Sequence, residues 1–89
     1  KGMHVTVHGR VQGVGFRFSA VDTAKRIGVT GWVRNNYDGT VEAFCEGESS
    51  KVDKYVDWLK KGPPTANVTR VDVKEISYKG RYNTFAIAY

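Results

Sequence analysis

The sequence predicts an α+β domain in which one antiparallel sheet carries two helices on a single face. Strand-like and helix-like segments follow one another in the order strand, helix, strand, strand, helix, strand, and an Asp-Gly pair separates the two middle strands. Two strand-helix-strand halves joined by a hairpin form the ferredoxin-like sandwich. A short alternating segment at the end adds a closing strand, and we expect residues 1–89 to form one domain.

The first half begins with a strand and a helix. Polar and apolar residues alternate over His4–His8, which predicts a half-buried strand. Apolar residues at helical spacing then predict a helix over Phe16–Ile27. Gly28 follows at the C-cap position, where helices commonly end in left-handed backbone.

A hairpin and a second helix come next. Two strands, Thr30–Asn35 and Thr40–Cys45, flank the Asp-Gly turn. Ser49 or Ser50 is expected to be the N-cap of the second helix. Four apolar residues in this helix are spaced i, i+3, i+4 and i+7, which predicts one stripe packed on the sheet: Val52, Tyr55, Val56 and Leu59.

The last third of the chain supplies the remaining strands. Gly62-Pro63-Pro64 ends the second helix, because proline cannot continue it. The fourth strand is predicted from the apolar residues Val71, Val73 and Ile76. The short closing strand is predicted from the alternation of Phe85, Ile87 and Tyr89.

Composition restricts the class of protein and of partner. The chain has 14 Lys and Arg residues against 9 Asp and Glu residues, a net charge of +5 that favours anionic partners. Cys45 is the only cysteine, so no internal disulfide forms and we expect a reducing cytoplasm. No apolar run approaches the ~18 residues of a membrane span, so no membrane partner is expected.

The glycine-rich stretch GRVQGVGFR, residues 9–17, lies between the first strand and the first helix. Backbone N–H groups at a helix start lack internal partners, and the helix dipole favours an anion there. Gly13 and Gly15 allow successive amides to turn toward one anion, and Arg17 adds a planar donor fork. The stretch therefore indicates a cradle for one phosphoryl group, although a tight packing turn has similar composition. It fits neither a Walker A loop nor a dinucleotide-binding fingerprint.

The other candidate residues restrict the chemistry. His4, His8 and Cys45 form no convincing zinc motif, and no nucleophile-base pair follows from spacing. A phosphate cradle alone suits an acyl phosphate, because the leaving carboxylate has a conjugate acid with a pKa of about 4 and departs without a proton. An amide side chain then suffices to orient water. Asn35 is the candidate, while Asn36 competes with it as a turn residue.

Two segments resemble the signatures of the acylphosphatases. Residues 9–17 resemble G-x-V-Q-G-V-x-F-R, and residues 31–42, GWVRNNYDGTVE, resemble G-W-V-x-N-x-x-D-G-x-V-E. The Gly-Pro-Pro segment and the closing Phe-x-Ile-x-Tyr also look like family features. The likeness extends from about His4 to Tyr89 and implies the same ferredoxin-like fold.

The resemblance implies a small cytoplasmic hydrolase that cleaves acyl phosphates to a carboxylate and inorganic phosphate. It implies that Arg17 and Asn35 are catalytic, with Arg17 binding phosphate and Asn35 orienting the attacking water. It also implies no metal and no cofactor, and we expect a monomer. The expected phosphate-binding residues are Gln12, Gly13, Val14, Gly15, Phe16 and Arg17.

Two features qualify the resemblance. Many relatives carry a basic residue beside the last aromatic of the closing strand, whereas Ala86 and Ala88 flank Ile87 here. Two other functions stay open: a regulatory domain without turnover, and an RNA-binding module of the same fold. We expect no nucleic-acid partner, because the glycine-aromatic stretch precedes the first helix and the third strand has only Phe44 as an aromatic.

Overall fold

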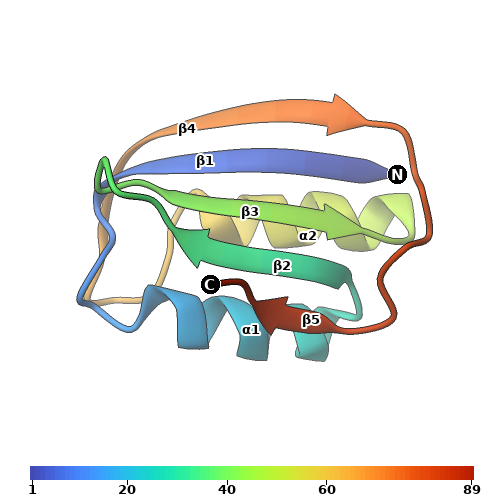
Figure 1. Ribbon diagram of the computed structural model, residues 1–89, viewed down its shortest axis with the longest axis horizontal. Coiled ribbons are helices and arrows are strands. Elements are labelled where there is room, and N and C mark those ends of the chain that lie inside the picture. The colour runs from blue at the N-terminus through green and yellow to red at the C-terminus, as the bar shows by residue number, and fades with distance from the viewer.

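The computed structural model describes residues 1–89 and contains five strands and two helices (Figure 1). Both helices are confirmed in place. The first and fourth strands are longer than the sequence pattern indicates, the two hairpin strands have the predicted length, and the closing strand is shorter. The elements are β1 (Gly2–Arg10), α1 (Phe16–Ile27), β2 (Thr30–Asn35), β3 (Val41–Glu46), α2 (Ser49–Leu59), β4 (Asn67–Ile76) and β5 (Phe85–Ile87).

The strands form one sheet in the order β4-β1-β3-β2-β5. The four longer strands pair antiparallel, as predicted. The closing strand β5, whose direction the sequence does not fix, pairs parallel with β2, so the five-stranded sheet is mixed. The reason is topological. The chain leaves β4 at the end of the sheet where β2 begins, crosses to the opposite edge and then runs beside β2 in the same direction (Figure 1).

Both helices cover one face of this sheet and enclose the core between them and the strands (Figure 1). The predicted apolar stripe of α2 is buried, and the Tyr55 hydroxyl donates a hydrogen bond of 2.9 Å to the Ala20 carbonyl of α1. Gly28 ends α1 in the left-handed conformation, with φ of 99°, and its N–H donates to the Ala24 carbonyl. The predicted C-cap is therefore confirmed.

The start of α2 differs from its prediction. Its N-cap is Glu48, and no side chain caps the helix, so the expectation that Ser49 or Ser50 is the N-cap is wrong. The Ser50 hydroxyl donates instead to the Glu48 carboxylate at 3.0 Å. The Glu48 carboxylate thus takes the Ser50 hydroxyl away from the backbone N–H groups of the first turn of α2. These N–H groups have no side-chain cap.

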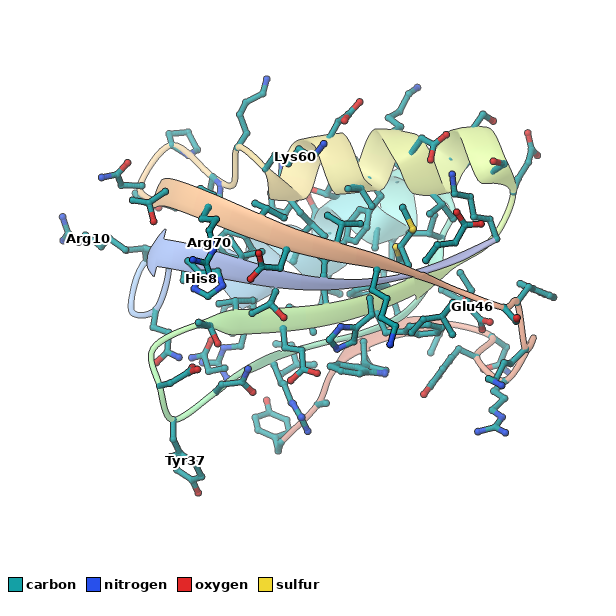
Figure 2. The ribbon with its side chains drawn as sticks, turned by 90° about the horizontal axis from the view of Figure 1, so that it is seen from above. His8, Arg10, Tyr37, Glu46, Lys60 and Arg70 are labelled. Atoms are coloured by element: carbon teal, nitrogen blue, oxygen red, sulfur yellow. The ribbon has the colours of Figure 1, made fainter.

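The opposite face of the sheet carries polar and aromatic side chains. His8 pairs with Asp72 at 2.8 Å, and Arg70 contacts both groups (Figure 2). Glu42 is half-buried by contacts with His4 and Arg34 and does not simply face solvent.

Phe44 is not an isolated aromatic on this face. Its ring stacks with Trp32 at a centroid distance of 6.5 Å and lies 5.7 Å from the ring of Tyr82. These rings pack against one another over the middle of the sheet.

Three connections meet at one end of the sandwich: the loop between β1 and α1, the hairpin between β2 and β3, and the link between α2 and β4 (Figure 1). Two segments that lie far apart in the sequence, residues 11–17 and 35–40, are thereby brought together. This end carries the residues that the sequence predicts to be functional.

Candidate functional site

The loop between β1 and α1 depends on two glycines. Gly13 and Gly15 have φ of 73° and 76°, in the left-handed region that favours glycine. A Cβ at either position would meet open space, so the requirement comes from backbone conformation and not from crowding. The two left-handed residues curl the loop directly before the first turn of α1.

The curled loop leaves its amides free. None of the backbone N–H groups from Gln12 to Phe18 donates a hydrogen bond within the protein, and the first helical bond runs from Ser19 to the Gly15 carbonyl. Gly15 is the N-cap and supplies no side-chain acceptor. Because the positive end of the helix dipole lies here as well, this segment is suited to bind an anion.

Contacts on both sides hold the loop in place. Val11 and Phe16 are buried in the core, and the Phe16 ring packs 5.6 Å from the ring of Trp58. The Thr65 hydroxyl donates to the Val14 carbonyl at 2.6 Å. An anion would therefore meet donors whose positions are already fixed, which is the arrangement that stabilises developing charge most effectively.

Arg17 and Asn35 line the same cavity as Gly13 and Gly15, with a volume of about 90 Å³. Arg17 is half-buried in the first turn of α1, and the arginines that form ion pairs are Arg26, Arg34 and Arg70. The guanidinium of Arg17 is thus free to meet an anion. The two predicted side chains come from different elements and are brought together by the fold.

The side chain of Asn35 is unusual because its Oδ1 atom is buried and accepts no hydrogen bond. A buried polar atom without a partner is destabilising and calls for an explanation, such as a catalytic role or a bound water. Its neighbour Asn36 makes the turn contact instead, since its Nδ2 atom donates to the Thr40 hydroxyl at 3.0 Å. Of the two asparagines, Asn36 serves the hairpin and Asn35 faces the cavity.

The side chain of Gln12 has a contact that the sequence does not reveal. Its Nε2 atom donates to the carbonyls of Asn36 at 2.7 Å and Thr40 at 3.0 Å, and so ties the loop to the hairpin. These partners lie 24 and 28 residues away, so no local spacing could have found them. The amide and hydroxyl of Thr40 also donate to Asp38 and hold the pKa of that carboxyl below its usual value.

Replacing Gln12 with alanine is expected to lower the free energy of unfolding by about 1–3 kcal/mol, because two hydrogen bonds are lost and their carbonyl acceptors lose a donor. Urea unfolding at constant pH measures this change. Ser50→Ala is the control, since it removes an exposed hydrogen bond and should change stability by less than about 0.5 kcal/mol. Equal stability of Gln12→Ala and the unaltered protein would show that the two hydrogen bonds of the Gln12 side chain do not stabilise the fold.

The other candidate residues lie outside this site. His4 and His8 project from the open face of the sheet toward Glu42 and Asp72. Cys45 is buried, and burial raises the pKa of its thiol to about 12, which makes it a poor nucleophile. No group of three or more His, Cys, Asp and Glu side chains is placed to hold a metal ion. Neither helix has the length and apolar character to span a membrane.

Comparison with known proteins identifies the family. The acylphosphatase family model matches residues 3–87. The chain is 48% identical over 87 residues to an acylphosphatase of Methylococcus capsulatus, covering 98% of this chain and 95% of that one. The crystal structure of acylphosphatase from Bacillus subtilis aligns with a TM-score of 0.94 and 36% identity, over 99% of this chain and 98% of that one.

The fold also recurs as part of a larger protein. Full-length HypF, in its phosphate- and nucleotide-bound form, aligns with a TM-score of 0.88 and 28% identity, over 99% of this chain but 12% of that one. The family match over residues 3–87 and the relatives of equal length carry the assignment: the chain belongs to the acylphosphatase family and is a hydrolase of acyl phosphates.

Proposed function

We propose that the cavity beside Gly13 and Gly15 holds the phosphoryl group of an acyl phosphate. The backbone amides of Gln12–Arg17 donate to its oxygens, and the guanidinium of Arg17 binds two of them as a fork. The observation that carries the proposal is that Arg17 and Asn35 line one small cavity beside seven free amides. A loose phosphoryl transition state spreads negative charge over three oxygens, and these donors surround that position.

In the proposed reaction, Asn35 orients the attacking water. The free Oδ1 atom of Asn35 accepts one O–H of the water and directs a lone pair of the water oxygen toward phosphorus. The bond from the water oxygen to phosphorus forms as the bond from phosphorus to the acyl oxygen breaks. The electron pair leaves with the carboxylate, and both protons of the water remain on the phosphate. An acyl phosphate dianion and water thus give one carboxylate and one dihydrogen phosphate anion.

This scheme needs no general acid for the leaving group, since a carboxylate is stable at neutral pH. It also requires no metal or cofactor, because the amides and Arg17 supply the positive charge. We further propose that residues 1–89 act as one monomeric domain in the cytoplasm. The substrate is a small-molecule acyl phosphate, and we propose no nucleic-acid partner.

Hydrolysis of benzoyl phosphate in excess EDTA tests the scheme. We expect rapid turnover, with kcat/KM equal within about twofold with and without the chelator. Inorganic phosphate should inhibit competitively, because the product occupies the same cradle. Loss of activity in EDTA that added divalent metal restores would overturn the metal-free mechanism, and absence of turnover by folded protein would indicate a domain that only binds.

A further inference from the structure

Two larger hollows adjoin the phosphate cavity, and each shares one of its lining residues. The first, the apolar hollow, has a volume of about 470 Å³ and is lined mainly by Phe18 and Val21 of α1, Phe85 and Ile87 of β5, and Tyr89. It shares Phe18 with the phosphate cavity.

The second, the polar hollow, has a volume of about 430 Å³ and is lined by Arg34, Asn35, Asn36, Tyr37 and Tyr89. It shares Asn35 with the phosphate cavity. Tyr89 lines both hollows and therefore stands between them.

In-line displacement at phosphorus assigns different roles to the two hollows. The attacking water and the leaving oxygen lie on opposite sides of the phosphorus atom. Under the proposed function the water lies beside Asn35, so the water enters from the polar hollow. The acyl group must then point away from Asn35. The residue that the phosphate cavity shares with the apolar hollow is Phe18, so we place the acyl group on the Phe18 side.

The lining of the apolar hollow defines what it can bind. Phe18 is 74% exposed and Tyr89 is 102% exposed, so both rings are available to a ligand without any rearrangement of the core. The two charged residues that line the hollow, Asp22 and Lys25, have opposite signs, and Asp22 already pairs with Arg26 at 2.8 Å. The hollow thus offers apolar contact without a strong charge.

We propose that the apolar hollow is the acyl-group subsite and that it selects uncharged aryl or bulky apolar acyl groups over acetyl. This assignment rests on the proposed function, because it takes its direction from the positions of Arg17 and Asn35. Contact with Phe18 and Tyr89 is made by the acyl group in both the ground state and the transition state, so it acts on KM more than on kcat.

The test compares benzoyl phosphate with acetyl phosphate in single variants. Each variant is referred to the unaltered protein with the same substrate, so the different intrinsic reactivities of the two compounds cancel. Phe18→Ala and Tyr89→Ala should each lower the benzoyl-to-acetyl ratio of kcat/KM by about fivefold to tenfold, mainly through a higher KM for benzoyl phosphate. Phe18→Leu should lower the benzoyl-to-acetyl ratio of kcat/KM less than Phe18→Ala does.

Tyr37→Ala is the matched control, since Tyr37, like Tyr89, is a fully exposed aromatic, and it lies on the polar hollow (Figure 2). Its ratio should stay within twofold of that of the unaltered protein. An unchanged ratio in both Phe18→Ala and Tyr89→Ala, or an equal fall in Tyr37→Ala, would overturn the subsite while leaving the hydrolase intact. Failure of the unaltered protein to hydrolyse either compound would instead contradict the proposed function.

Discussion

Arg17→Ala is expected to lower kcat/KM for benzoyl phosphate by a factor on the order of 10²–10³ or more. A single preorganised donor to a developing oxyanion contributes this much, and Arg17 adds a full charge to the donation. The guanidinium lies half-buried beside the cavity, where screening by water is weaker than at the open surface. Steady-state kinetics with purified, folded variant measures the change.

Two further variants make the Arg17 result specific. Arg17→Lys keeps the charge but replaces a planar fork with a point charge, so we expect most of the loss to persist. Arg10→Ala is the control, because Arg10 is an exposed arginine at the end of β1 whose side chain points away from the sandwich (Figure 2). It should retain activity within about twofold. Near-normal turnover by Arg17→Ala would remove Arg17 from the mechanism, and near-normal turnover by Arg17→Lys would contradict the role of the planar fork.

Local sequence signals were sufficient for the elements. Helical spacing identified α1 and the stripe of α2, and Asp-Gly identified the hairpin, because each depends on residues only a few positions apart. The pairing of β5 with β2 was beyond these signals. Alternation in Phe85–Ile87 predicts a strand but does not fix its partner or its direction, which depend on where the chain leaves β4.

The candidate site, like the fold, is only partly predictable from local sequence. Glycines followed by an arginine at a helix start indicate an anion cradle from local chemistry alone, whereas the roles of Arg17 and Asn35 rested on the family signatures. That these two side chains line one cavity depends on the sheet order, which places the β1–α1 loop beside the hairpin. The tie from Gln12 and the hollows around Phe18 and Tyr89 join residues that are distant in sequence, so no spacing pattern predicts them.

Asn35→Ala is expected to separate catalysis from stability. If Asn35 positions the attacking water, its loss should lower kcat by a factor on the order of 10² or more, which is the usual effect of misplacing a reacting group. The inhibition constant for inorganic phosphate should change by less than about threefold, because the amides and Arg17 remain. The free energy of unfolding should hold or rise slightly, since the substitution removes a buried oxygen without a partner.

Asn36→Ala is expected to show the opposite pattern, a loss of stability with little loss of turnover. The comparison therefore distinguishes the roles of the two asparagines. Asn36→Ala removes the hydrogen bond to the Thr40 hydroxyl, so stability should fall by about 0.5–1.5 kcal/mol while turnover changes much less than in Asn35→Ala. Kinetics, phosphate inhibition and urea unfolding on both variants give the comparison. Loss of phosphate binding in Asn35→Ala, or a fall in its stability to match Asn36→Ala, would make Asn35 a structural residue of the hairpin. The hydrolase would then orient its water by another group, and the unpartnered Oδ1 atom would need a different explanation.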